Sequence, residues 1–165
     1  MAPSLTELQK ILRYVPSEGA FYWLTDHKHP KARIGMQAGR INKQGRAQIG
    51  YKRSQLFVHR LVWLFETGAW PTALVDHIDG DPLNNKFANL RVTDYYGNSQ
   101  NQQAVRPNNK SSKLLGVSWH SRHKKWIASI KVHGKKLHLG YYTDANKAHA
   151  AYVNAKRIHH PLGQL

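Results

Sequence analysis

The sequence contains no cysteine among its 165 residues. Disulfide bonds and thiolate zinc sites are therefore excluded, which agrees with a reducing compartment. Long hydrophobic runs are also lacking, because the apolar run in the centre, Leu61 to Phe65, is far too short to span a bilayer. The start, Met1 to Ser4, is not followed by the apolar segment of a signal peptide. We therefore expect an intracellular protein that is neither secreted nor bound to a membrane.

Acidic residues are scarce, since 9 Asp and Glu stand against 25 Lys and Arg, a formal net charge of +16. Such an excess costs free energy through self-repulsion unless a polyanion is bound. Basic and acidic residues number 10 and 3 in 1–58, 3 and 5 in 59–102, and 12 and 1 in 103–165, or net charges of +7, −2 and +11. Two basic segments flanking a slightly acidic centre predict nucleic-acid binding.

The length of the chain suits one ordinary domain or two small ones. Residues 104–113 are polar, interrupted by proline and positively charged, which is typical of a linker. We therefore expect a first domain over 1–103, a linker over 104–113 and a second domain over 114–165.

The first domain is expected to begin with a helix. Ser4 and Glu7 have the form of a capping box, and apolar residues then recur at helical spacing as far as Leu12. This pattern predicts a helix over about 5–14 that stops before Pro16.

Residues 19–58 are rich in glycine, arginine and short β-prone segments. They predict twisted hairpins with basic edges, with strands at 21–24, 47–51 and 55–58. A short helix over 59–67 should follow and end at Gly68. Four basic residues of this region are expected to clamp phosphates: Arg40, Arg46, Lys52 and Arg53.

The segment from Val75 to Asn98 carries the most informative pattern. Asp76 and His77 are adjacent, Asn89 follows His77 by twelve residues and Asn98 follows it by twenty-one. Carboxylate and amide oxygens suit a hard divalent cation, and a histidine can deprotonate water near neutral pH. These residue types at these intervals can build a one-metal phosphodiesterase.

The local pattern predicts how this segment folds. Residues 74–75 begin a strand that ends at Asp76-His77, a loop with Gly80 follows, and residues 90–92 return as a second strand. Thr93 can then cap a helix over about 94–103 that presents Asn98. With no cysteines to bind zinc, stability must come from an apolar core, for which we expect Leu61, Val62, Leu64, Phe65, Leu74, Leu90 and Val92.

Residues 59–102 closely resemble the HNH, or His-Me finger, endonucleases of bacteriophages. Besides the four residues of the pattern, the resemblance rests on Gly80, Asn84-Asn85, Leu90 to Thr93, His59 to Trp63 and Trp70-Pro71. It implies that His77 is the general base and that Asp76 and Asn98 bind one Mg²⁺ or Mn²⁺ per active site. It also implies that Asn89 hydrogen-bonds across the loop and orients the imidazole.

Some neighbours of this pattern have two readings. Asn84, Asn85 and Arg91 either structure the loop or contact phosphate, and we include Arg91 among the expected DNA contacts. His59 either touches DNA or packs at the start of its helix. The remaining histidines, including His27, His29, His159 and His160, are expected at the solvated surface.

Residues 115–158 resemble the DNA-binding domain of plant ethylene-response factors. The matching residues are Gly116 to Trp119, Lys125 to Lys131, Leu137 to Gly140 and an alanine-rich helix with Tyr152. The pattern predicts strands at 115–120, 125–132 and 136–142, a turn at His133-Gly134 and a helix over 144–158. The resemblance implies a three-stranded sheet that enters the major groove of DNA, with the helix packed behind it.

Alternation along these strands predicts one apolar and one basic face. The expected DNA-side residues are Ser118, His120, Arg122, Ser129, Lys131, Lys136 and His138. Because Ser, His and Lys mostly replace the arginines of that family, bidentate readout of guanine is weakened. Trp119 and Trp126 either stack on DNA or pack in the core.

Together these observations predict an α+β protein: N-terminal β-hairpins plus a ββα-metal finger, then a three-stranded antiparallel sheet packed on one helix. The expected function is a metal-dependent homing-type endonuclease that nicks or cuts double-stranded DNA in the host cytoplasm or nucleoid. One active centre per chain favours a monomer over a dimer. The alternatives are a non-catalytic DNA-binding regulator with a degenerate finger, and an RNA-binding or RNA-cleaving protein, against which a groove-reading sheet argues.

Overall fold

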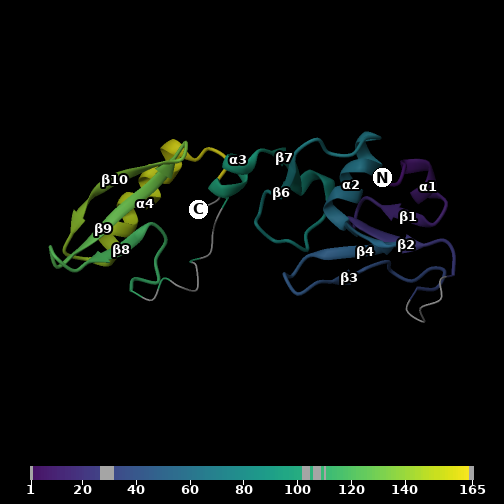
Figure 1. Ribbon diagram of the computed structural model, residues 1–165, viewed down its shortest axis with the longest axis horizontal. Helices are drawn as coiled ribbons and strands as arrows, with labels where there is room; N and C mark the ends of the chain where they lie inside the picture. The colour runs from purple at the N-terminus through teal and green to yellow at the C-terminus, as the bar shows by residue number, and fades with distance from the viewer. Residues whose placement is uncertain (1, 27–31, 102–104, 106–108, 110, 164–165) are drawn as a thin grey trace. The chain divides into compact units, whose positions relative to one another are not determined.

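The computed structural model of the chain describes residues 2–26, 32–101, 105, 109 and 111–163 (Figure 1). It is an α+β fold of small antiparallel sheets and short helices, as the sequence predicts. The chain divides into two compact units, Met1–Thr93 and Asp94–Leu165. This division lies ahead of the predicted linker at 104–113, much of which falls outside the described residues. Within the described part of the chain, no helix is long and apolar enough to cross a membrane.

The first unit begins with a helix that is shorter than the sequence predicts. In α1 (Leu5–Gln9) the Ser4 hydroxyl accepts the Glu7 N–H at 3.2 Å, and the Glu7 carboxylate accepts the Ser4 N–H at 2.9 Å. The capping box is thus confirmed, but the predicted extent of 5–14 is wrong. Residues 12–15 are extended instead, because β1 (Leu12–Val15) pairs antiparallel with β2 (Ala20–Trp23). Leu12 is buried from a strand rather than from a helix.

A three-stranded antiparallel sheet follows, made of β3 (Arg40–Ile41), β4 (Ala47–Tyr51) and β5 (Ser54–Phe57). The turn at 52–53 joins β4 directly to β5, since Tyr51 pairs with Ser54. The strands predicted at 47–51 and 55–58 are therefore confirmed to within one residue.

The helix α2 (Val58–Thr67) runs directly out of β5 and buries its apolar side. Val58, Leu61, Val62 and Leu64 lie in one core together with residues of α1, β1, β2 and β4. The helix ends at Gly68, whose φ of 79° is the left-handed conformation that glycine adopts readily and whose N–H donates to the Leu64 carbonyl at 2.9 Å. The predicted helix end is confirmed.

The hairpin that carries the predicted active residues consists of β6 (Leu74–His77) and β7 (Leu90–Thr93), with a 3₁₀ turn, η1 (Phe87–Asn89), immediately before β7. Val75 and Leu90 join the core of the first unit. The predicted core positions Leu74 and Val92 are wrong, since they are 43% and 36% exposed. Leu74 lies on the face of the ribbon opposite Val75, whereas Val92 pairs with the buried Val75 and is itself partly exposed.

The second unit begins with α3 (Tyr95–Gln100), whose N-cap is Asp94 and not the predicted Thr93. The Asp94 carboxylate accepts the Gly97 N–H at 2.7 Å, whereas Thr93 is the last residue of β7. An aspartate at this position satisfies a helix N–H that has no partner within the helix, which explains the shift by one residue.

The strands β8 (Val117–His120), β9 (Lys125–Val132) and β10 (Lys135–Tyr142) form an antiparallel sheet in the order β10-β9-β8. Figure 1 shows α4 (Ala145–His159) lying along this sheet. Ala128 and Ala148 are fully buried between sheet and helix, because small side chains allow close approach. The predicted sheet packed on one helix is confirmed.

Two details of the second unit correct or support the sequence analysis. His133 and Gly134 have φ of 46° and 81°, as a tight hairpin turn between β9 and β10 requires. His160, expected at the solvated surface, is buried, and its Nε2 lies 2.8 Å from the Lys131 carbonyl oxygen. His27 and His29 lie outside the described residues.

Candidate active site and nucleic-acid surface

The β6–β7 hairpin brings Asp76 and His77 into a largely buried position, where they are 9% and 5% exposed. In its register His77 pairs with Leu90 and Asp76 pairs with Arg91. Adjacent strand residues point to opposite faces, so His77 shares the core side with Val75 while Asp76 points to the other side. The imidazole and the carboxylate are therefore held at one strand end and project to opposite faces of the ribbon.

The loop from β6 to η1 supplies a polar contact to the His77 ring. Oδ1 of Asn85 lies 3.2 Å from Nε2 of His77, and Asn85 is only 4% exposed. Of the two readings open for Asn85 from the sequence, the structure supports a role inside the loop.

The His59 ring also packs against the His77 ring. The two rings lie 5.2 Å apart in an edge-on arrangement, and the His59 ring stacks on Phe57 at 5.4 Å. Burial first, and then the electrostatic influence of neighbours that include Arg46 and Arg60, lowers the pKa of His59 from its ordinary 6.5 to about 3. His59 is therefore a neutral packing residue at neutral pH, one of the two readings that the sequence left open.

Asn89 ties the loop after His77 together. Its Oδ1 accepts the Asp79 N–H at 3.1 Å, and its Nδ2 donates to the Asp79 carboxylate at 2.9 Å and to the Asn84 carbonyl at 2.8 Å. Burial acts to raise the pKa of Asp79, but hydrogen bonds from Asn84, Asn89 and the Asp81 N–H outweigh it and keep that pKa below its ordinary value. Asn89 thus bridges the loop, and the contact recorded at Nε2 of His77 comes from Asn85.

Arg91 contacts Asp76 across the hairpin. Nε and Nη2 of Arg91 donate to Oδ2 of Asp76 at 3.1 and 2.8 Å, and both side chains are mostly buried. The guanidinium therefore balances the negative charge of Asp76, which sequence reasoning had not foreseen. A phosphate contact of Arg91 stays a prediction.

Asn98, the other predicted metal ligand, lies in α3 and belongs to the second unit. Its backbone N–H donates to the Asp94 carbonyl at 3.0 Å, so its place on the helix follows from the Asp94 cap. The donor set of Asp76 and Asn98, one carboxylate and one amide oxygen, fits the chemistry of Mg²⁺ or Mn²⁺. The described residues contain no group of three or more His, Cys, Asp or Glu that could hold a metal ion.

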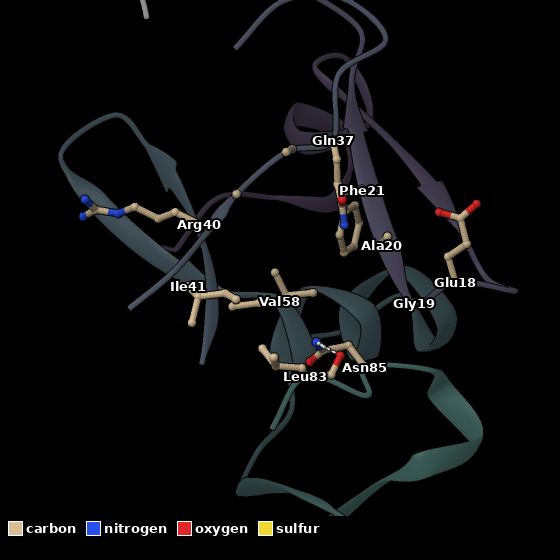
Figure 2. A pocket seen from close by; sticks show the side chains of 13 residues that line it. Glu18, Gly19, Ala20, Phe21, Gln37, Arg40, Ile41, Val58, Leu83 and Asn85 are labelled. Carbon is tan, nitrogen blue, oxygen red and sulfur yellow. Dashed lines mark hydrogen bonds between the residues drawn. The ribbon is translucent and has the colours of Figure 1, made fainter. Parts of the chain in front are cut away.

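A pocket of about 320 Å³ adjoins the loop that carries Asn85 (Figure 2). Its walls come from the β1–β2 turn, from β3 and from the loop at 83–85. Gly19 and Asn85 lie close together at one end of it, and Arg40 extends from its rim.

The basic residues predicted in the N-terminal region are exposed. Arg40 lies on β3, Arg46 precedes β4, and Lys52 and Arg53 form the β4–β5 turn. The Lys52 ammonium lies 3.4 Å from the Glu7 carboxylate in an exposed ion pair. Arg46 is near enough for its charge to act on His59, which places this residue on the side of the candidate site.

The predicted DNA-side residues of the second unit share a face. Directly paired residues project to the same side of a sheet, and the pairs are His120 with Lys125, Ser129 with His138 and Lys131 with Lys136. Ser118, paired with Ile127, has the same parity, and Ala128 and Ile130 are buried on the helix side. Arg122 lies in the β8–β9 turn. One open face therefore carries six of the seven residues.

Aromatic rings gather on the same open face. The Tyr141 ring lies 4.7 Å from that of His138 and 5.6 Å from that of His120. On the other face Trp126 packs with the core, whereas its neighbour Trp119, 4.9 Å away, is 45% exposed. Core packing therefore describes Trp126 and only partly describes Trp119.

Comparison with known proteins matches one part of the chain to a family model. Residues 56–99 match the HNH endonuclease family model. This HNH segment, residues 56–99, contains His59, Asp76, His77, Asn89 and Asn98. It runs from β5 through α2 and the β6–β7 hairpin into α3.

Two further proteins are similar beyond the HNH segment. Protein 3.8 of Escherichia phage T7 is 35% identical over 79 residues, which are 47% of this chain and 64% of that protein. The chain thus spans less than two thirds of this relative. A solved structure of the HNH homing endonuclease I-HmuI, described by its binding and cleavage of DNA, is similar at 23% identity with a TM-score of 0.47, covering 84% of this chain and 77% of that one.

Proposed function

We propose that this protein is a metal-dependent endonuclease that hydrolyses phosphodiester bonds in double-stranded DNA. The observation that carries the proposal is the placement of His77 in the HNH segment: it lies at a rigid strand end beside Asp76, with Asn85 at its Nε2. An imidazole whose Nε2 is held by a polar loop residue is oriented as a general base requires.

Each residue of the site has a distinct task. His77 takes a proton from the attacking water, whose oxygen bonds to phosphorus while the bond to the leaving oxygen breaks. Asp76 and Asn98 hold one Mg²⁺ or Mn²⁺, which when bound stabilises the negative charge of the phosphate and of the leaving oxygen. Asn89 keeps the loop closed through Asp79 and Asn84.

Two sets of basic residues bring the DNA to this site. The exposed Arg40, Arg46 and Arg53 of the first unit bind phosphates, and the open face of the β8–β10 sheet binds the duplex groove. With serine, histidine and lysine on that face, base readout is weak and backbone contact dominates. The second unit thus helps to choose the site, as in a homing-type enzyme, and a monomer is sufficient to nick one strand.

Cleavage of a long duplex with Mg²⁺, and its loss with EDTA, tests the proposal. His77→Ala should lower the cleavage rate about 100- to 10,000-fold while leaving duplex affinity within a few-fold. The matched control is His133→Asn, at a turn position whose positive φ asparagine tolerates. Unchanged cleavage by His77→Ala, or duplex binding without any cleavage by the wild type, would leave a DNA-binding regulator as the better description. Preference for duplex RNA over DNA would point to the RNA alternative.

A further inference from the structure

The carboxamide of Asn85 determines which nitrogen of His77 carries the proton. Its Nδ2 donates to the Leu83 carbonyl at 3.0 Å, and a carbonyl can only accept. Oδ1 therefore faces Nε2 of His77 at 3.2 Å, and an amide oxygen can also only accept. Nε2 must then be the N–H of the neutral ring, which leaves the lone pair of the imidazole on Nδ1.

The backbone that carries Asn85 rests directly on the β1–β2 turn. A Cβ placed on Gly19 would lie 2.4 Å from the carbonyl carbon of Asn85 and 2.5 Å from both its oxygen and the nitrogen of Lys86. These are backbone atoms of one peptide, so a side chain at position 19 could be accepted only if that peptide moved. Figure 2 shows Gly19 next to Asn85 at the end of the pocket.

Gly19 is itself firmly placed. Its φ of +64° is the left-handed conformation, and its N–H donates to the Val15 carbonyl at 3.0 Å across the turn. The turn closes the β1–β2 hairpin, whose Phe21 is buried in the core of the first unit. The surface that receives the Asn85–Lys86 peptide is therefore rigid.

The same peptide also leads to Asn89. Lys86 is the N-cap of η1, and its carbonyl accepts the Asn89 N–H at 2.8 Å. A shift of this peptide would move both the contact to His77 and the bridge through Asn89.

We propose that Gly19 is a positioning residue for His77: it seats the Asn85–Lys86 peptide so that Asn85 holds Nε2 of His77 as the N–H and directs Nδ1 to the reaction. This proposal rests on the function proposed above, in which His77 is the base. It assigns to the N-terminal hairpin, outside the HNH segment, a part in setting the active imidazole.

The spectroscopic test uses the full chain and does not depend on cleavage. The wild type should show a hydrogen-bonded Nε2–H proton of His77 that exchanges slowly with water, assigned by its absence in His77→Gln. This signal should be lost in Asn85→Leu, which removes the acceptor, and in Gly19→Ala. It should persist in Gly35→Ala, the matched control, because Gly35 has a φ of +79° and a Cβ there would meet nothing within 4 Å.

The kinetic test asks whether Gly19 acts through Asn85. Gly19→Ala should slow cleavage about 10- to 100-fold with duplex affinity unchanged, since small displacements of a catalytic group cost rates of this order. Gly35→Ala should stay within about 2-fold of the wild type, because exposed changes without contacts matter little. If the two residues act in series, Gly19→Ala should add no further loss to Asn85→Leu.

Three outcomes would each overturn the positioning role. The Nε2–H signal could persist in Gly19→Ala, the losses could be additive in the double variant, or the wild type could carry the proton on Nδ1 of His77. If Gly19→Ala fails to fold, the Asn85→Leu signal and rate still decide whether the carboxamide sets the ring. A wild type that does not cleave DNA refutes the proposed function alone, because the N–H signal still reports the contact.

Discussion

The rings of His59 and His77 meet edge to face, with centroids 5.2 Å apart and planes at 72°. His59 comes from the first turn of α2 and His77 from the end of β6, so this contact fixes the strand end against the helix. The Phe57 ring stacks on His59 with centroids 5.4 Å apart, so His59 contacts both Phe57 and the candidate base.

Acid should destabilise the first unit through His59. The pKa of His59 is about 3 in the folded protein, whereas an unfolded histidine titrates near 6.5. Between these values the unfolded state binds a proton that the folded state does not, so the free energy of unfolding falls as the pH drops from about 6.5 towards 3. His59→Phe should remove up to about 1.4 kcal/mol of this loss per pH unit, measured by urea unfolding at a series of pH values.

The control for this prediction is His138→Phe, which makes the same replacement on the exposed face of the second unit. It should leave the acid dependence of the first unit as in the wild type. Equal acid dependence in the wild type and His59→Phe would show that His59 is not the group that titrates on unfolding.

The ion pair between Asp76 on β6 and Arg91 on β7 should contribute to the free energy of unfolding of the first unit. Arg91→Gln and Asp76→Asn should each lower the free energy of unfolding by about 1–3 kcal/mol, because each leaves a mostly buried charge without its partner. The double variant should lose clearly less than the sum, measured by urea unfolding. Simple additivity would mean that the pair contributes nothing beyond its separate side chains.

The Mg²⁺ concentration needed for cleavage should distinguish residues that bind the metal from residues that do not. Asp76→Ala and Asn98→Ala should each raise the Mg²⁺ concentration needed for half-maximal cleavage, because each removes one oxygen donor. Asn154→Ala, an exposed change of the same kind on α4, should leave it unchanged. A metal requirement unaltered in both Asp76→Ala and Asn98→Ala would contradict the ligand assignment.

The open face of the β8–β10 sheet should contribute to the salt dependence of binding. Lys131 and Lys136 are paired across two strands on that face. Replacing each with alanine should reduce the slope of log affinity against log salt by about one per residue, measured by duplex titration at several salt concentrations. Lys147→Ala, which removes the same charge from α4, should leave the slope unaltered, and an equal change there would mean general charge effects.

The sequence correctly predicted helix caps and turns that depend on neighbouring residues. The Ser4–Glu7 capping box, the helix end at Gly68 and the turn at His133-Gly134 each depend on residues within a few positions, and all are confirmed. The helix predicted over 5–14 failed because Leu12 serves a strand whose partner, Trp23, lies eleven residues away. Apolar spacing cannot distinguish a buried helix residue from a buried strand residue over such a short run.

The candidate site was predictable in its residue types and less so in its contacts. The spacing of Asp76, His77 and Asn89 indicated the chemistry, and the structure places all three around one hairpin. The contact of Gly19 with the Asn85–Lys86 peptide joins residues far apart in sequence, and the contacts of His77 with Asn85 and His59 depend on how the loop and α2 fold. Only the adjacent Asn84-Asn85 and the His59 to Trp63 stretch hinted at them.

The shared core of the first unit has a consequence for how this segment can be exchanged between proteins. Leu8, Phe21 and Ile49 lie before the HNH segment, yet they pack with Leu61, Leu64 and Leu90 inside it. If the HNH segment were excised by itself, one apolar side of α2 would be exposed to solvent. The loop that carries Asn85 would also lose its contact with Gly19. We therefore expect that moving the HNH segment to another protein requires residues 1–55 with it, or a replacement of matching shape.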